Sequence, residues 1–463
     1  MIKKSFYILL TLTLIIFVSC KSSSKSTSTY FGGKIINPKT DYVVLFEMEK
    51  AVDTFFLDDN NRFLGKIDFK NEGLYYFKHG REHQYLYIEP KDSLLIRLNT
   101  LNFDESLVFS GKGAQRNNFL LDCFIDEEKD NQKFYEYYLL NPSDFKQKVD
   151  SLEKTKLLKL EDFFKRDLNE TDKFKEFLSI AITYPLYSKI EDYPIKHSLL
   201  SNAKDFPKLT ENFYSHRKNV NLNKESLIYY YVYSNYLTNY LYNKTYSKGF
   251  EPNTKDYSGD FSTAMLNVIE DNIQSEKTKN ILLRQTINSH FFRKSSCDTN
   301  DEVFNTYFAL STNEEDKNQI KNLLEDSKLQ KTGKKISNFI LTDYTNKSFN
   351  SNDLLKDQNS LIYFWNSKYV SEDYLASRIG YLISNNPGVQ FIGVKIDGNS
   401  ASHIKGLDIN NQYFIDSSSN ANTFLTSKLP RTILVNKDGL IVNGYASFSS
   451  KKIYNQVKDL AKN

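Results

Sequence analysis

Three side chains with reactive oxygen atoms lie close together where an apolar run gives way to a polar one: Tyr369, Ser371 and Glu372. A phenol, a hydroxyl and a carboxylate can act as nucleophile or as general acid and base when their surroundings tune them. No histidine is near them in the sequence to serve as the base. Glu372 and Asp373 also put two carboxylates in the first turn of a helix expected from Ser371 onward, where they stabilise the helix but repel an incoming anion. We therefore expect no catalytic residue here.

The residues before this cluster predict a buried strand that leads into the helix. They read Leu361-Ile362-Tyr363-Phe364-Trp365. The segment resembles the active site of the TlpA-like family of membrane-anchored thioredoxin-like proteins, in which Phe-Trp is followed by Trp-Cys-x-x-Cys. Tyr369 and Glu372 occupy the two cysteine positions. A thioredoxin needs a low-pKa thiolate to attack a disulfide and a second thiol to resolve the mixed intermediate, which neither a phenol nor a carboxylate can do.

The dipeptide Leu429-Pro430 extends the resemblance. In the family, the proline at this position is cis, and the adjacent backbone pairs with a substrate peptide. X-Pro bonds tolerate the cis form at low cost. The resemblance therefore implies a groove for an extended peptide without the thiols, and the alternative is a plain proline at the entry to a strand. The peptide-binding residues that we expect are Trp365, Tyr369, Glu372, Leu429, Pro430 and Arg431.

Metal and cofactor chemistry has little support elsewhere in the chain. His79 and His83 are four residues apart, which suits a metal only on a helix, whereas Gly80 between two β runs predicts a loop. Lys78 and Arg81 also oppose a bound cation, so we interpret the segment as a solvated hairpin. The sequence contains no P-loop, dinucleotide-binding fingerprint, nucleophile elbow or zinc-ligand cluster. No metal and no cofactor are expected.

The N-terminus has the pattern of a lipoprotein signal peptide over residues 1–20. Lys3 and Lys4 precede an apolar run that ends with a small residue directly before Cys20. A transmembrane anchor is the alternative, but the run of about 13 residues is short of the ~20 that span a bilayer. We expect lipidation of Cys20 to anchor the chain in a membrane, with residues 21–29 as a flexible tether. By resemblance to Gram-negative lipoproteins, Ser22 predicts the periplasmic face of the outer membrane.

Two further cysteines are present, Cys123 and Cys297. In an oxidising compartment they could form a structural disulfide, but neither has a partner at CxxC spacing. Two inert buried thiols are the simpler expectation. No cysteine follows Cys297, so the region that resembles a thioredoxin contains no thiol.

The predicted elements fall into three domains of a multidomain α+β protein. Residues 30–111 contain short β runs at hairpin spacing, which is typical of a small β-sandwich or barrel. The order of these runs also resembles the β domain that precedes the redox domain in TlpA-like lipoproteins. Residues 112–332 form a middle helical region, and residues 334–463 alternate strand and helix, as an α/β thioredoxin-like domain requires.

Two patterns in the helical region predict local structure. Thr312 and Glu315 form a capping box that predicts Thr312 as the N-cap of the last helix. The helical spacing of Tyr229, Tyr233, Tyr236 and Tyr240 favours one packed face over an aromatic platform for a sugar or peptide.

Composition leaves two classes of function. The chain has 463 residues, and its net charge of +4 falls to +2 without Lys3 and Lys4, which gives no basis for a nucleic-acid partner. The first class is a non-enzymatic lipoprotein whose redox-inactive thioredoxin-like domain binds an unknown envelope protein or peptide. The second is a thiol-disulfide oxidoreductase or peroxide reductase that uses some other cysteine. The absence of thiols after Cys297 favours the first class.

Overall fold

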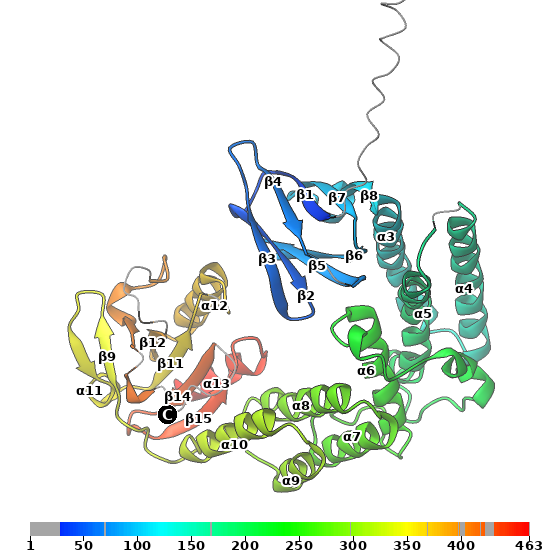
Figure 1. Cartoon of the computed structure of the whole chain (residues 1–463). Coiled ribbons are helices and arrows are strands. Elements are labelled where there is room, and N and C mark those ends of the chain that lie inside the picture. Colours follow the sequence, from blue (N-terminus) through cyan, green and yellow to red (C-terminus); the bar gives the residue numbers. More distant parts are fainter. Residues whose placement is uncertain are drawn as a thin grey trace, which may run out of the picture. The chain divides into compact units, whose positions relative to one another are not determined.

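The computed structural model describes residues 28–68, 71–166, 169–296, 298–367, 369–396, 398, 403–416, 418–421 and 430–462. Helices and strands both contribute, so the chain is a mixed α/β protein (Figure 1). It divides into two compact units. The first runs to Ile190 and includes Ser226–Tyr236, and the second comprises Glu191–Glu225 and Leu237–Asn463. Helices α5 (Asp172–Ser201) and α6 (Tyr231–Tyr246) contribute residues to both.

The first unit begins with two four-stranded sheets. One has the order β4-β1-β7-β8, and its strands are β1 (Thr29–Ile36), β4 (Arg62–Ile67), β7 (Ser93–Asn99) and β8 (Val108–Lys112). The other has the order β3-β2-β5-β6, with β2 (Tyr42–Glu47), β3 (Lys50–Phe56), β5 (Gly73–His79) and β6 (Glu82–Ile88). A short helix, α2 (Phe103–Ser106), lies between β7 and β8.

Alternating apolar residues of these strands form one shared core. On β1, Phe31 and Ile35 are buried, and their cluster includes Val43 and Phe77 of the other sheet. The period of two sends every second side chain to the opposite face, so each sheet has a buried and an outward face. The helices that follow are α3 (Ala114–Tyr137) and α4 (Pro142–Phe164).

Helix α3 closes one side of this β structure through two consecutive asparagines. Asn117 accepts from the Tyr87 amide at 2.7 Å and donates to the Tyr87 carbonyl at 2.9 Å. Asn118 makes the same pair of bonds with Phe109, both at 2.9 Å. Because Tyr87 and Phe109 lie on the edge strands β6 and β8, each side-chain amide satisfies backbone groups that would otherwise be open to another strand.

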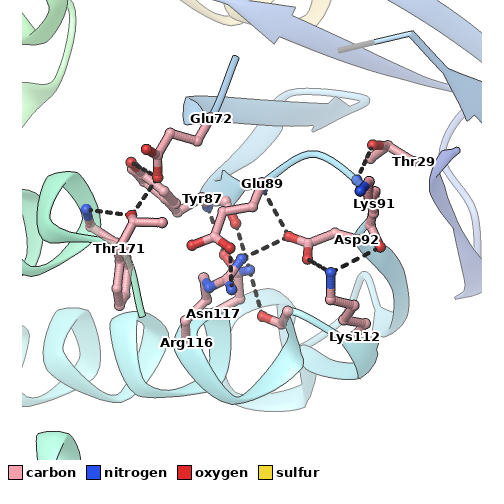
Figure 2. A network of polar contacts seen from close by, with 12 residues as sticks. Thr29, Glu72, Tyr87, Glu89, Lys91, Asp92, Lys112, Arg116, Asn117 and Thr171 are labelled. Atoms are coloured by element: carbon pink, nitrogen blue, oxygen red, sulfur yellow. Dashed lines mark hydrogen bonds and ion pairs between the residues drawn. The ribbon is translucent and has the colours of Figure 1, made fainter. Parts of the chain in front are cut away.

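The preceding residue, Arg116, is the centre of a buried polar network (Figure 2). Its guanidinium pairs with Asp92 at 2.7 Å, with Glu170 at 2.8 Å and with Glu89 at 2.9 Å. Glu89 and Asp92 flank the turn between β6 and β7, and Glu170 precedes α5. One cation therefore connects the sheets to the helices of this unit.

The structure corrects our interpretation of His79. Its side chain is buried, and its Nε2 accepts from the Lys39 amide at 2.9 Å while Nδ1 lies 3.0 Å from the Tyr42 carbonyl. Burial lowers its pKa, and the hydrogen bond to Tyr42 opposes that shift. Gly80 does form a turn with positive φ, and His83 is exposed. His79 therefore lies in the predicted hairpin between β5 and β6, but its side chain is buried against Lys39 and Tyr42 and is not solvated.

The second unit contains α7 (Gly259–Asn272), α8 (Glu276–Arg293), α9 (Asp301–Leu310) and α10 (Glu314–Leu329), preceded by a 3-10 helix at Glu211–Asn219. A further 3-10 helix, Glu225–Leu227, contributes residues to both units. The predicted cap of α10 is wrong by one residue. Asn313, not Thr312, is the N-cap and accepts from the Asp316 amide at 3.1 Å. The Thr312 hydroxyl instead donates to Glu276 at 2.9 Å, so a tertiary contact competes for the group that the pattern assigns to the cap.

A seven-stranded sheet follows, in the order β10-β9-β13-β12-β11-β14-β15. Its strands are β9 (Ile340–Asp343), β10 (Ser348–Asn350), β11 (Ser360–Trp365), β12 (Gln390–Lys395), β13 (Gln412–Phe414), β14 (Arg431–Val435) and β15 (Ile441–Ala446). The helices here are α11 (Ser351–Leu355), α12 (Glu372–Asn385) and α13 (Lys452–Leu460), with a 3-10 turn at Ile409–Asn411. Strand β11 is parallel to β12 and antiparallel to β14.

Strand β11 is buried on both faces, as the apolar run predicts. Ile362 and Phe364 belong to one core, while Leu361, Tyr363 and Trp365 belong to the other. The second core includes residues of α12 and α13. The predicted helical face is present in α6, where Tyr233, Tyr236 and Tyr240 are buried, whereas Tyr229 precedes the helix and is half-buried. Among the described residues, no helix is long and apolar enough to span a membrane.

Candidate functional site

A pocket of about 580 Å³ lies where Tyr369 and the start of β14 meet the turn after β15. Three segments of the sheet region line it, and α8 and the turn before α7 line the remainder. Six of its lining side chains are aromatic. The lining residues are Tyr257, Phe292, Arg293, Tyr369, Tyr374, Pro430, Arg431, Tyr445, Ala446, Ser447, Phe448, Ser449 and Ser450.

Tyr369 presents its side chain to this pocket and is 70% exposed. Its amide donates to the Asn366 carbonyl at 3.0 Å, which folds the chain into a turn directly after β11. Ser371 then caps α12 by accepting from the Tyr374 amide at 3.4 Å, as the sequence predicts. The turn and the cap together place Tyr369 and Tyr374 on the wall of one hollow.

The structure separates the other predicted residues. Pro430 lines the pocket beside Tyr369, whereas Leu429 lies outside the described residues, and with it the Leu429-Pro430 bond. Glu372 is half-buried in the first turn of α12 and does not line the pocket. Trp365 is 1% exposed and packs in the core beneath α12 and α13, because its place on β11 sends it to that face.

Arg431 lines the pocket, but its guanidinium is bound by its own chain. It forms a buried ion pair with Asp326 of α10 and donates to the Gly444 carbonyl at 3.0 Å and 3.2 Å. The guanidinium also lies 3.9 Å from the centre of the Tyr445 ring, and the Tyr445 hydroxyl donates to the same Asp326 carboxylate. Arg431 thus joins α10, β14 and β15 into one wall.

Arg378 of α12 holds the turn that carries the serines of the pocket. Its Nε donates to the Phe448 carbonyl at 3.0 Å, and a second nitrogen donates to the Ser450 carbonyl at 3.4 Å. It also bonds the Tyr454 hydroxyl and lies 4.3 Å from the centre of that ring. The Ser447 and Ser449 hydroxyls, 2.9 Å apart, are therefore fixed at the rim.

Arg293 of α8 is a second cation that lines the pocket. It pairs with Asp256 and lies 5.4 Å from the centre of the Tyr257 ring. Burial lowers the pKa of its guanidinium, but the bond to Asp256 and that carboxylate's charge raise it by more. The sequence analysis missed Tyr257, Phe292 and Arg293, because only tertiary packing brings these helical residues to the sheet.

No cysteine, histidine or carboxylate is present among the described residues that line the pocket. Among the described residues, no group of three acidic, histidine or cysteine side chains is placed to hold a metal ion. What the pocket offers is aromatic contact area, serine and tyrosine hydroxyls and the backbone of the 446–450 turn. Groups of this kind suit recognition of a ligand with both apolar and hydrogen-bonding parts.

The one described cysteine, Cys123, is free, lies on α3 in the first unit and does not line the pocket. Burial raises the pKa of its thiol to about 12, although Lys159 and Lys156 oppose the shift. A thiol with so high a pKa is a poor nucleophile at neutral pH. Cys20 and Cys297 lie outside the described residues.

No protein-family model matches the chain, and no curated protein matches it. Solved structures do match parts of it. The thioredoxin domain of a thiol-disulfide oxidoreductase from Bacteroides vulgatus is 21% identical, with 28% of this chain and 97% of that one covered and a TM-score of 0.23. A thioredoxin-like protein from Bacteroides caccae is 16% identical over 45% of this chain and 88% of that one, with a TM-score of 0.26.

A secreted disulfide oxidoreductase from Mycobacterium tuberculosis is also similar to part of this chain. It is 16% identical, with 26% of this chain and 94% of that one covered and a TM-score of 0.21. The solved structures that are similar to part of this chain therefore include thiol-disulfide oxidoreductases and a thioredoxin-like protein.

Proposed function

We propose that the chain is a lipid-anchored periplasmic protein that binds an extended peptide or a protein partner without redox chemistry. The observation that carries this proposal is the pocket beside Tyr369 and Pro430. It brings an exposed aromatic ring and the entry of β14 to a hollow of about 580 Å³ whose described lining residues include no thiol.

The topology of the second unit supports a thioredoxin-like region. Strand β11 leads through α12 to the parallel β12, and the antiparallel pair β14–β15 is followed by α13. The same order of strands and helices is expected for the thioredoxin-like domain that the sequence predicts over residues 334–463. Strand β14 starts at Arg431, which pairs with Phe364 of β11, so Pro430 lies directly before an interior strand of the sheet.

The replacements at the former cysteine positions support binding over catalysis. Tyr369 at the first position is exposed and lines the pocket, and Glu372 at the second does not line it. An extended peptide needs only accessible backbone groups and pockets for alternate side chains. The Tyr369 ring and the 446–450 turn supply contacts of that kind.

The anchor rests on the N-terminal sequence. Cys20 ends a signal-peptide pattern, and several acyl chains on one cysteine would hold the chain at a membrane. The periplasmic face of the outer membrane is the location proposed from Ser22.

A peptide-display selection on the chain from residue 21 onward tests the binding role. We expect Tyr369→Ala to lower the affinity for the selected peptides at least about tenfold, which corresponds to roughly 1.4 kcal/mol of binding free energy. The thermal unfolding midpoint should not change. Tyr135→Ala is the matched control, because Tyr135 is 66% exposed on α3 of the other unit. If the peptides bind the Tyr369→Ala chain as tightly as the unmodified chain, the pocket is not the peptide-binding site.

The alternative, a thiol-disulfide oxidoreductase or peroxide reductase, makes the opposite prediction. We expect the purified chain to reduce insulin no faster than buffer with dithiothreitol, because Tyr369 and Glu372 replace the thiols. Turnover above that background that persists in the Cys123→Ala, Cys297→Ala double variant would show that redox chemistry does not need cysteine here. Turnover that disappears in the double variant would favour the alternative.

A further inference from the structure

The outward face of the sheet β4-β1-β7-β8 carries an unusual set of side chains. Registered strand pairs place Arg62, Lys34, Arg97 and Val108 in one row across the sheet. The next row is Leu64, Gly32, Leu95 and Ser110, and the third is Lys66, Tyr30, Ser93 and Lys112. Five of these twelve residues are cationic and none is acidic.

The cations on this face are available to a ligand. Lys34, Arg62, Lys66, Arg97 and Lys112 are all exposed. Of these five cations, only Lys112 forms an ion pair with a described residue, and its Nζ lies 3.9 Å from the buried Asp92 carboxylate. The opposite side of the same strands forms the core, so the alternation of the strands directs these charges outward together.

The face is also apolar at its centre. Leu64 and Leu95 are exposed between the two cationic rows, Val108 is exposed within the first of these rows, and Phe56 is also exposed. A shallow hollow of about 700 Å³ runs over Gly33 and Leu95 toward Ser110. Asp58 at the rim is the one carboxylate among the residues that line the hollow. Exposed apolar side chains ringed by lysine and arginine suit the boundary between lipid headgroups and acyl chains.

We propose that this face docks on a membrane surface that carries anionic headgroups. The proposal rests on the lipid anchor proposed above, because only residues 21–28 separate Cys20 from the start of β1 at Thr29. Even fully extended, a link of this length spans on the order of 30 Å. Strand β1 lies inside the sheet that bears the cations, so an anchored chain keeps this face close to the bilayer.

Charge decides how the anchored chain is held. A lipid anchor alone leaves the first unit free to rotate about the tether, whereas each lysine or arginine near an anionic surface adds attraction that fades beyond about 10 Å. Five cations on one face would therefore turn that face of the sheet toward the membrane.

Vesicle binding by the unlipidated chain tests the proposal separately from the anchor. The chain from residue 21 onward is mixed with vesicles of phosphatidylcholine alone or with about 30 mol% phosphatidylglycerol. We expect binding to the anionic vesicles only, and binding that weakens as sodium chloride rises. The triple variant Lys34→Gln, Arg62→Gln, Arg97→Gln should bind about a hundredfold more weakly.

The matched control is Lys148→Gln, Lys154→Gln, Lys165→Gln, which removes three exposed lysines at α4 of the same unit. It should bind as the unmodified chain does, and circular dichroism should show both variants folded.

Equal binding of the two triple variants to anionic vesicles would overturn the proposal. Binding of the unmodified chain to neutral vesicles as tight as its binding to anionic ones would also overturn it. Self-association of the chain that the first variant abolishes, without vesicle binding, would assign the face to a second copy instead. If the chain is not acylated at Cys20 in cells, the proposed anchor is wrong. The vesicle result still tests the cationic face, because the protein used in that experiment carries no lipid.

Discussion

At the scale of single residues, Arg431 shows how tertiary packing changes the meaning of a side chain. The sequence places it directly after the proline of the expected groove, where a cation could bind a peptide. In the structure it is 2% exposed and bound to Asp326 and the Gly444 carbonyl. It therefore shapes the pocket wall, and Tyr369 is the predicted residue whose side chain is accessible there.

Removal of the Asp326 carboxylate should lower the stability of the second unit. Asp326→Ala leaves the Arg431 guanidinium buried without its carboxylate, so we expect the free energy of unfolding of the second unit to fall by about 3–5 kcal/mol. Urea unfolding followed by circular dichroism measures it. The double variant Asp326→Leu, Arg431→Met should recover most of the loss, because neither charge remains buried.

An exposed ion pair serves as the control for that prediction. Asp459 and Lys462 lie 3.6 Å apart at the end of α13, with both side chains largely exposed. Asp459→Ala should cost less than about 1 kcal/mol. A similar loss in Asp326→Ala and Asp459→Ala would mean that the buried pair does not hold the wall.

At the scale of elements, helix α3 organises the first unit with three consecutive residues. Arg116 collects three carboxylates, and Asn117 and Asn118 each close the edge of one sheet. Nothing in the sequence distinguishes these residues from other polar residues on the helix. Their roles follow from the place where α3 meets β6 and β8.

The Arg116 network should make the stability of this unit depend on pH. Burial raises the pKa of Glu89, of Asp92 and of Glu170, and Arg116 opposes the shift in each case. Other charged groups near these carboxylates are Glu72 before β5, Lys112 at the end of β8 and Lys175 on α5. A carboxyl whose pKa is raised on folding binds more protons in the folded state. Its contribution to stability is therefore present below the unfolded pKa of about 4.3 and is lost as pH rises through the folded pKa.

Glu89→Gln tests that sign, because Glu89 Oε1 is buried without a hydrogen bond among the described residues. We expect the unfolding free energy of the variant to rise relative to that of the unmodified chain as pH increases from about 4 to 7. Urea unfolding at several pH values measures the difference. Glu82→Gln, on the exposed part of β6 and outside the network, is the control. A difference for Glu89→Gln that changes with pH no more than the difference for Glu82→Gln would contradict the role of the network.

At the scale of the whole molecule, the proposed anchor decides where both binding surfaces operate. Cys20→Ala removes the acceptor thiol, so we expect the variant to remain unprocessed or unlipidated and to lose acyl label in the membrane fraction. Metabolic labelling with a clickable fatty acid followed by fractionation measures this. Cys123→Ala, which removes a thiol on α3, should label as the unmodified chain does. Acyl label that persists in Cys20→Ala would refute the lipoprotein interpretation.

The sequence by itself determined the features that depend on local order along the chain. The apolar run of β11, the Ser371 cap of α12 and the buried tyrosines of α6 follow from periodicity and capping, which involve neighbours only. Tertiary structure alone decided which side chains meet. In the tertiary structure His79 is buried, Asn313 is the N-cap of α10, and the Trp365 side chain packs in a hydrophobic core.

The pocket and the cationic face show the same division. Tyr369 and Pro430 could be named from the sequence, but Tyr257, Phe292 and Arg293 reach the pocket from elements more than seventy residues away. The cationic face combines residues from four strands, and only their register aligns the charges into rows. Local patterns specify elements because their energies depend on adjacent residues, whereas sites depend on contacts that exist only after the elements pack.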